Sequence, residues 1–522
     1  MRLLSLAATL LMGVPVTGPA AHEPPATPDR SVVRTDLGTL RGTVDGDRRT
    51  FQGIPYAAPP VGALRWRAPQ DPAPWSGVRD ATAPGRPCAQ QPSADPTVVD
   101  PREDCLYLNV TTPTAPGRDR PVIVWLHGGS FQTGTGSAYD ARRLAAAGDT
   151  VVVTVNYRLG VFGYFGLPGL AGSGTFGLQD QQAALRWVRR NAAAFGGDPH
   201  NVTLAGQSAG GLSVCAQLTS PAAAGLFDKA IIQSGSCLLD WPAGLFFGLP
   251  AGSQWTDRAA LETAGHRLAG ELGCAEDDPE TLACLRAVGR DELIAATTGV
   301  GQAAFALPAY GNPVLPANPA DALRAGAFRR VPVLSGSNLD EFRGFLGAVD
   351  EWLPYTAEQY AAALDAAFGD QAGRVAAAYP VAAYADRPGL AWAAVATDRM
   401  WACPTLAGDR LLARHTPVYG YEFAERHGPA LDDAYPWGAS HGYELPYLFD
   451  GIVWLRGTAQ PELAGEMVRE WSRFAATGAT SWPRVRADAT VPYVRTLAAG
   501  GSGRVDFGAE HRCAFWATVP DA

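Results

Sequence analysis

Short apolar runs rich in β-branched residues recur along most of the chain and are separated by stretches with helical periodicity. Residues 179–195, for example, place Leu185, Val188 and Ala192 on one helical face. The strongest candidate strands are residues 121–126, 150–155, 202–205, 230–233, 331–334 and 418–423. Continuous apolar strands spaced by helices are typical of parallel sheets that are buried on both faces. The pattern therefore predicts an α/β fold with a mostly parallel central sheet covered by helices on both faces.

Two regions depart from this pattern. Residues 32–44 alternate between apolar and polar positions and lead into Asp45-Gly46, a turn signal between antiparallel strands. Residues 241–325 mix helical periods with many glycines and prolines, and we expect them to be insertions around the sheet. We therefore predict one domain over residues 31–518.

The first twenty positions have the pattern of a signal peptide. A minimal basic start at Arg2 is followed by an apolar run over residues 3–16, and Gly18 and Ala20 match the small residues of a cleavage site. The run is too short for a bilayer, which needs about 20 apolar residues. We expect residues 1–20 to be a signal peptide and the mature protein to be secreted, without a stable membrane anchor. A buried first helix is the alternative.

Charge and composition narrow the possible partners. A formal net charge of −9 argues against a nucleic-acid partner. The eight cysteines of an exported chain indicate disulfides, although their spacing alone leaves the pairing open. The sequence has no Cys-x-x-Cys motif and its eight histidines are scattered, so we expect neither a metal site nor a cofactor. The expected partner is a small molecule, and the oligomeric state is not predicted.

A nucleophile motif lies after the candidate strand 202–205. Residues 206–210 read Gly-Gln-Ser-Ala-Gly, which matches the G-x-S-x-G elbow, and a helical stretch follows. A sharp turn from strand to helix strains the serine backbone, and only flanking glycines leave room for it. The motif predicts Ser208 as the nucleophile of a hydrolase. A structural serine in a glycine-rich turn is the alternative.

A second motif could stabilise the negative charge that attack by a serine creates. His127 and two glycines follow the candidate strand 121–126 and have the form of an HGG-type loop. Backbone N–H groups in such a loop bind the oxyanion, and each donor is worth about 3–4 kcal/mol. The predicted donors are Gly128, Gly129, Ser130 and Ala209. An ordinary turn after a strand is the alternative.

Longer motifs around these residues resemble the type-B carboxylesterase and cholinesterase family. Residues 195–210 fit the nucleophile signature of that family, residues 103–110 fit its second signature, and residues 51–62 are similar to its N-terminal block. The resemblance covers about residues 32–516. It implies an α/β-hydrolase fold in which insertions form the active-site gorge, and a serine esterase that acts through an acyl-enzyme intermediate.

The general base must be a histidine late in the chain, because α/β-hydrolases have the order serine, acid, histidine. Only His415, His427, His441 and His511 lie late enough. His441 lies in a glycine-flanked loop after the last strong strand, and we interpret the other three as surface residues. The family has its catalytic histidine in a matching His-Gly-Tyr-Glu, which implies His441.

The resemblance implies that the acid is Glu341, the second acid of an Asp-Glu pair that follows the candidate strand 331–334. Relatives usually continue with glycine, whereas this chain has Phe342, so Asp340 stays an alternative. Glu341 would orient the imidazole and stabilise the imidazolium. By the same resemblance, Ser234 and Glu444 support the histidine, and we expect Gln207, the residue before the nucleophile, to lie directly behind the reacting groups.

Family positions also imply three disulfides: Cys88–Cys105, Cys274–Cys284 and Cys403–Cys513. Cys215 and Cys237 are left, and either a fourth disulfide or two buried free thiols would fit them.

Two departures from the cholinesterases bear on the substrate. No aromatic residue lies between Cys88 and Cys105, and Gln207 is neutral where cholinesterases have glutamate. Both sources of attraction for a choline cation are therefore missing, which predicts a carboxylesterase for neutral esters. An extracellular lipase or polyester hydrolase stays an alternative. A catalytically inactive adhesion or binding module is the alternative of another class, although such relatives lack a member of the triad.

Overall fold

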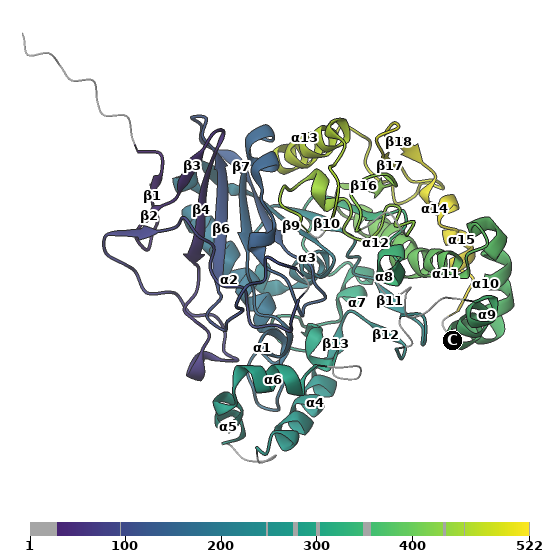
Figure 1. The fold of residues 1–522 in the computed structure, drawn as a ribbon, viewed down its shortest axis with the longest axis horizontal. Coiled ribbons are helices and arrows are strands. Elements are labelled where there is room, and N and C mark those ends of the chain that lie inside the picture. The colour runs from purple at the N-terminus through teal and green to yellow at the C-terminus, as the bar shows by residue number, and fades with distance from the viewer. Residues whose placement is uncertain are drawn as a thin grey trace, which may run out of the picture.

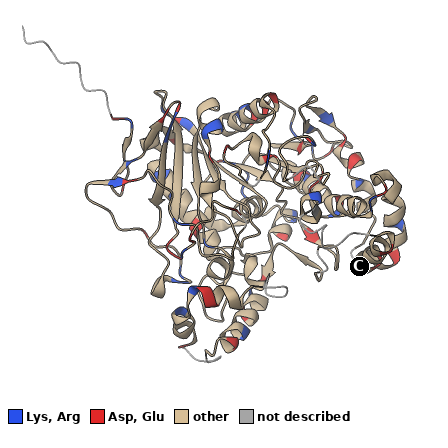
Figure 2. Ribbon diagram, viewed as in Figure 1, with Lys and Arg blue, Asp and Glu red and all other residues tan. Residues whose placement is uncertain are grey.

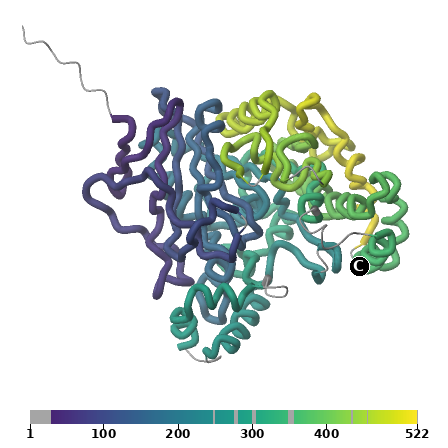
Figure 3. Tube along the Cα trace, in the orientation of Figure 1, coloured from purple at the N-terminus to yellow at the C-terminus, as the bar shows by residue number. Residues whose placement is uncertain are grey.

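The computed structural model describes residues 29–93, 95–246, 249–274, 280–298, 303–347, 356–431, 435–453 and 455–520. The predicted signal peptide, residues 1–20, lies outside these ranges. Across the molecule the chain progresses from the N-terminal part on one side to the C-terminal part on the other (Figure 3). Basic and acidic residues are interspersed along the ribbon (Figure 2).

An eleven-stranded sheet runs through the middle of the molecule (Figure 1). In spatial order its strands are β18 (Gly503–Val505), β17 (Val494–Leu497), β16 (Val418–Phe423), β15 (Val333–Asn338), β10 (Lys229–Gln233), β9 (Gly197–Gln207), β7 (Arg120–Leu126), β8 (Val151–Val155), β6 (Tyr107–Pro113), β4 (Arg48–Pro55) and β3 (Thr43–Asp45). The pairs from β17 to β8 are parallel, and the pairs at both edges are antiparallel. The predicted mostly parallel sheet is confirmed.

Two central strands extend into polar sequence that the apolar pattern did not predict as strand. β9 begins at Gly197, before the predicted start at residue 202, and its first residue pairs with Arg120 of β7. β15 continues beyond residue 334 to Asn338, because its backbone pairs with β16 over that whole length. Backbone hydrogen bonds to neighbouring strands satisfy the buried polar groups, so these segments do not need apolar side chains.

Helices cover the sheet on both faces because alternate side chains of each strand point in opposite directions. Val124 of β7 belongs to one hydrophobic cluster, together with residues of α2 (Phe176–Asn191) and α3 (Ala209–Thr219). The next residue, Trp125, belongs to the cluster on the other face, together with residues of α13 (Pro461–Thr477). The predicted covering of both faces is confirmed.

The N-terminal segment is β structure, as predicted. β3 and β4 form a hairpin around Gly46, whose φ of 56° suits glycine. A separate three-stranded sheet consists of β1 (Val32–Arg34), β2 (Thr39–Arg41) and β5 (Val78–Asp80).

Most of the helices outside the central layers lie in two groups. The first, at the lower end in Figure 1, is α4 (Arg258–Glu271), α5 (Thr281–Ala287) and α6 (Arg290–Ala296). The second, beside the C-terminus, includes α9 (Ala357–Phe368), α10 (Ala372–Ala378) and α11 (Pro388–Ala396). The other helices are α1 (Gly160–Tyr164), α7 (Pro319–Arg324), α8 (Arg343–Gly347), α12 (Cys403–Ala413), α14 (Phe507–Glu510) and α15 (Cys513–Trp516). Leu261 of α4 packs in one cluster with Phe165, so the first group shares a core with the main body.

Four disulfides are present: Cys88–Cys105, Cys215–Cys237, Cys274–Cys284 and Cys403–Cys513. The three pairs that the family positions implied are therefore formed. The pair that the sequence left open is also bonded, so Cys215 and Cys237 are not free thiols. In the ranges given above, no helix is both long and apolar enough to cross a bilayer.

Candidate active site

Ser208 lies between the end of β9 and the start of α3, in a strained backbone conformation. Its φ of 57° and ψ of −125° are rare for a residue with a side chain. The flanking glycines are required by the close approach of neighbouring backbone. A Cβ on Gly206 would lie 2.5 Å from the carbonyl carbon of Gly210, and a Cβ on Gly210 would lie 2.0 Å from the oxygen of Leu126. The local sequence therefore forms the sharp strand-to-helix turn that the G-x-S-x-G motif predicts.

The loop after β7 packs directly on this elbow. A Cβ on Gly128 would lie 3.1 Å from the Cβ of Ser208. Gly129 and Ser130 both have positive φ, at 109° and 54°. The hydrogen bonds of the described residues leave the N–H groups of Gly128, Gly129 and Ser130 unused. Ala209 is the first residue of α3, so its N–H has no partner within the helix. No hydrogen bond of the described chain uses these four N–H groups, and the loop that carries three of them packs against Ser208.

His127 stabilises this loop as a neutral side chain. Burial lowers the pKa of His127 to about 4. Its Nδ1 lies 2.8 Å from the carbonyl oxygen of Gly128 and donates to it, since a carbonyl only accepts. The ring stacks on Tyr157, whose hydroxyl donates to the His127 carbonyl oxygen at 2.7 Å. His127 therefore has a structural role in the loop.

The sheet brings His441 and Glu341 together. His441 Nδ1 lies 2.6 Å from Glu341 Oε2, and the side chain of Glu341 is fully buried. Burial lowers the pKa of His441, but the charge and hydrogen bond of Glu341 and the charge of Glu444 outweigh burial and raise it above its usual value. An imidazole with a raised pKa is a stronger base.

The neighbouring acid, Asp340, has other partners. Arg426 donates to its two carboxylate oxygens at 2.7 and 3.0 Å, and Arg343 lies 2.9 Å away. The N–H of Ala439 donates to Asp340 at 3.1 Å, which ties the acid turn to the loop that carries His441. Burial raises the pKa of Asp340, but these partners outweigh it and lower the pKa below its usual value. The geometry therefore pairs Glu341, and not Asp340, with the imidazole.

The outer ring nitrogen of His441 faces Gln207. Its Nε2 lies 3.1 Å from Gln207 Nε2, so the amide donates to an unprotonated ring nitrogen. The proton of the neutral ring is then on Nδ1, toward Glu341. Within the described chain no hydrogen bond joins the Ser208 hydroxyl to His441.

Two polar residues that the sequence reasoning missed hold the acids in place. Asn338 donates its backbone N–H to Glu341 at 2.8 Å and its side-chain amide to Glu444 at 2.7 Å. Gln233 donates to Glu444 at 3.0 Å and accepts from Trp471 at 2.8 Å. Burial, with the charge of Glu341, raises the pKa of Glu444. A possible signal in the sequence was the position of both residues at the ends of predicted parallel strands.

Ser234, which the resemblance also implied, lies beside these groups, but its hydroxyl has no hydrogen-bond partner in the described part of the chain. It therefore does not contact His441 through a hydrogen bond.

The interpretation of His511 as a surface residue is wrong. The residue is 2% exposed, and its Nδ1 and Nε2 lie 2.5 Å from Asp398 and 2.7 Å from Glu422. The charges around His511 in the sequence suggested solvent, but its partners come from distant segments. His415 and His427 are exposed, as predicted.

The comparisons with known proteins agree with this geometry. The sequence profile of the carboxylesterase family matches residues 29–516. The chain is 37% identical over 480 residues to para-nitrobenzyl esterase of Bacillus subtilis, an alignment that covers 87% of this chain and 92% of that protein. It is 33% identical to fumonisin B1 esterase of Sphingopyxis macrogoltabida, with 92% and 88% covered. A solved structure of a PNB esterase superposes with a TM-score of 0.76 at 33% identity and covers 92% of this chain and 98% of that chain.

Similarity in sequence and structure thus extends over nearly all of the chain. The fold is the α/β-hydrolase fold, in agreement with the expectation from the motifs. The protein belongs to the carboxylesterase family and is a carboxylic ester hydrolase.

Proposed function

We propose that the protein is a serine carboxylesterase that hydrolyses neutral carboxylic esters with Ser208, His441 and Glu341 as a triad. The observation that carries the proposal is the position of His441. Glu341 orients the imidazole through a hydrogen bond with Nδ1. On the other side of the ring, Nε2 contacts Gln207, the residue before Ser208. His511, by contrast, has a carboxylate at each ring nitrogen.

In the proposed first step, the Gln207 amide leaves Nε2 and the Ser208 hydroxyl takes its place. His441 Nε2 accepts the hydroxyl proton while Ser208 Oγ bonds to the ester carbonyl carbon. The N–H groups of Gly128, Gly129, Ser130 and Ala209 are positioned to stabilise the oxyanion. Collapse of this intermediate releases the alcohol, which takes the proton from Nε2, and leaves an acyl ester on Ser208.

In the second step, water attacks the acyl ester and gives a proton to His441 Nε2. Collapse of the second tetrahedral intermediate returns that proton to Ser208 Oγ and releases the carboxylic acid. Glu341 accepts the hydrogen bond from Nδ1 throughout and stabilises the imidazolium in each half-reaction.

Export is part of the proposal. The first twenty residues have the signal-peptide pattern, and four disulfides fit an oxidising compartment outside the cytoplasm. N-terminal sequencing of protein from the culture medium tests it, and a mature start near residue 21 is the expected result.

A covalent label tests the nucleophile. We expect a stoichiometric organophosphate to abolish hydrolysis of p-nitrophenyl butyrate and to modify Ser208 in a peptide map. Ser208→Ala should neither be labelled nor hydrolyse the ester. His427→Ala, a control at an exposed position, should be labelled and should hydrolyse the ester as the native enzyme does. A label on another serine would refute the assignment.

A further inference from the structure

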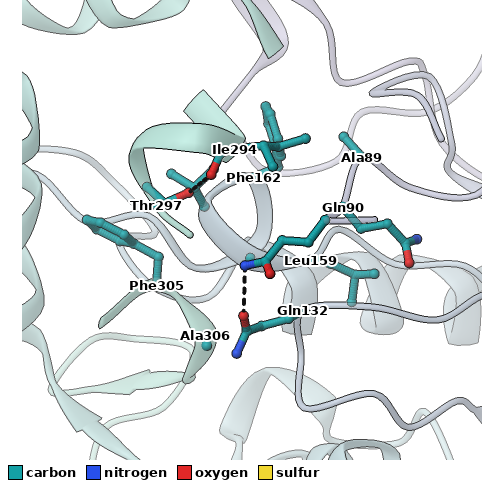
Figure 4. Close-up of a pocket in the computed structure, with 12 residues that line it drawn as sticks. Ala89, Gln90, Gln132, Leu159, Phe162, Ile294, Thr297, Phe305 and Ala306 are labelled. Carbon is teal, nitrogen blue, oxygen red and sulfur yellow. Dashed lines mark hydrogen bonds between the residues drawn. The ribbon is translucent and has the colours of Figure 1, made fainter. Parts of the chain in front are cut away.

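A small pocket with two glutamine amides lies beside the loop that carries the proposed oxyanion donors. Figure 4 shows it between Gln132, on that loop, and the side chains of Phe162, Ile294 and Phe305. Gln91 Nε2 donates to Gln132 Oε1 at 3.1 Å. The free space, about 20 Å³, suffices for one water-sized group.

The pocket is tied to the elbow through a single loop. Gln132 donates its backbone N–H to the carbonyl oxygen of Gly129 at 2.9 Å, within the turn that presents Ser130. The same loop packs Gly128 against Ser208. The Gln132 side chain is therefore anchored one turn away from the reacting centre.

A neighbouring glutamine fixes the other wall. Gln90 donates to the carbonyl oxygens of Cys88 and Gly134, at 2.8 and 3.0 Å, and accepts from the N–H of Gly134 at 2.9 Å. The two bonds with Gly134 join the disulfide-closed segment to the loop of the proposed oxyanion donors, and Gln91 follows directly. The pocket is thus held in shape before any ligand binds.

The pocket is uncharged and offers both a hydrogen-bond donor and a hydrogen-bond acceptor. Among the described residues that line it, none is acidic or basic. No hydrogen bond of the described chain uses Gln91 Oε1, an acceptor, or Gln132 Nε2, a donor. A charged group would be desolvated here without a counterion, which is costly.

Building on the proposed esterase function, we propose that this pocket binds a hydroxyl group carried by one arm of the ester. The hydroxyl would donate to Gln91 Oε1 and accept from Gln132 Nε2, in a space of its own size. Its source is the alcohol arm or the acyl arm of the substrate. The preferred substrates are then neutral esters with a hydroxyl a few carbons from the reacting bond.

Matched ester pairs test this proposal. One series compares ω-hydroxyalkyl butyrates with alkyl butyrates of the same number of heavy atoms, and a second places the hydroxyl on the acyl chain of a methyl ester. Two neutral hydrogen bonds predict a preference in kcat/KM of roughly tenfold for the hydroxy ester at one chain length, in one of the two series.

Three variants then locate the preference. Gln132→Met and Gln91→Met, which keep the side-chain length, should each reduce the ratio from about tenfold to about threefold, because each removes one of two similar hydrogen bonds. Gln70→Met, an exposed glutamine outside the pocket, should keep the ratio of the native enzyme. Two results would overturn this inference and leave the proposed function intact. One is that the native enzyme cleaves every ester with no preference for the hydroxyl, and the other is that both pocket variants keep the full preference. Failure of the native enzyme to cleave even methyl butyrate would overturn the proposed function as well.

Discussion

His441 and His511 are both paired with carboxylates, and they differ in what contacts the second ring nitrogen. His441 Nδ1 lies 2.6 Å from Glu341, while its Nε2 faces a neutral amide. His511 has a carboxylate at each nitrogen, Asp398 at Nδ1 and Glu422 at Nε2. His441 contacts Gln207, the residue before the strained serine, and His511 lies at the end of α14, near the C-terminus.

This difference separates the proposed base, His441, from a structural cation, His511. Burial lowers the pKa of His511, but its two acids outweigh burial and raise the pKa to about 10. Such a ring is an imidazolium at neutral pH and has no lone pair to accept a proton. His441 has one acid at Nδ1 and keeps Nε2 unprotonated, as the contact with the donor amide shows. One paired acid activates the imidazole, whereas two acids fix its charge.

The largest expected effect distinguishes the two rings by activity. His441→Ala should lower kcat at least a thousandfold, because the proposed base is lost. His511→Ala should keep kcat per folded molecule within a few-fold of the native value. Active-site titration of the folded fraction, followed by steady-state assays, measures both. Equal losses of kcat in the two variants would remove the distinction.

The next effect distinguishes the rings by stability. His511→Gln removes the imidazolium from between two buried carboxylates, of which Asp398 keeps Arg512 at 3.6 Å, so we expect the free energy of unfolding at pH 6 to fall by about 3–5 kcal/mol. The folded pKa of about 10 lies above the unfolded value of about 6.5. The stability from His511 is therefore fully present below pH 6.5 and is lost as the pH rises to 10.

Urea denaturation between pH 6 and pH 10 measures this effect. The free energy of unfolding of the native protein should fall between pH 6 and pH 10. For His511→Gln the part of this fall that comes from His511 should be absent. His427→Gln, at an exposed position, should follow the native curve. An identical pH dependence for the native protein and His511→Gln would contradict the assignment of the buried imidazolium.

The same comparison shows what the sequence could predict. Ser208 and its loop partners are encoded in contiguous motifs, since an elbow and a turn are formed by neighbouring residues. The acid and the base lie in short motifs that a family resemblance identifies. The partners of His511 lie 113 and 89 positions away in the chain, and only the register of β16 and the path of the C-terminal segment bring them together. No local pattern records such a contact.

The fold likewise has parts that the sequence could predict and parts that it could not. Central strands with apolar side chains were predictable, because burial on both faces requires such residues. The polar ends of β9 and β15 were not, because backbone pairing alone holds them in the sheet. Asn338 lies in one of these polar ends, which is why its contacts with both acids were missed.

The third prediction changes the charge around His441. Gln207→Glu would place a carboxylate beside Nε2 and should raise the pKa of His441, so the acidic limb of kcat/KM should move to higher pH by about one unit. Glu444→Gln removes a charge that raises the pKa and should move this limb to lower pH by less. Profiles of p-nitrophenyl butyrate hydrolysis from pH 5 to pH 9 measure both shifts. Shifts of the same sign would contradict the electrostatic account.

The smallest expected effect concerns a cationic substrate. Near the C-terminus, the cation of Arg512 is bound both by a carboxylate and by the face of a ring. Arg512 lies 3.6 Å from Asp398 and 4.5 Å from the centre of the Tyr379 ring. Beside His441 the Trp401 ring is stacked on Phe345 at 5.6 Å and an angle of 22°, so one of its faces is covered.

A desolvated contact between a cation and a ring is worth about 2 kcal/mol or more, which is about thirtyfold in specificity. Gln207 supplies no charge to replace it, and the loop closed by Cys88 and Cys105 supplies no aromatic ring. We therefore expect kcat/KM for butyrylcholine to be no higher than for its neutral isostere, 3,3-dimethylbutyl butyrate. A tenfold preference for the cation would mean that an aromatic ring such as Trp401 or Trp241 binds the alcohol arm. Gln207→Glu should increase kcat/KM for butyrylcholine relative to the neutral isostere. The new carboxylate would attract the cation beside Ser208, as Asp398 attracts Arg512.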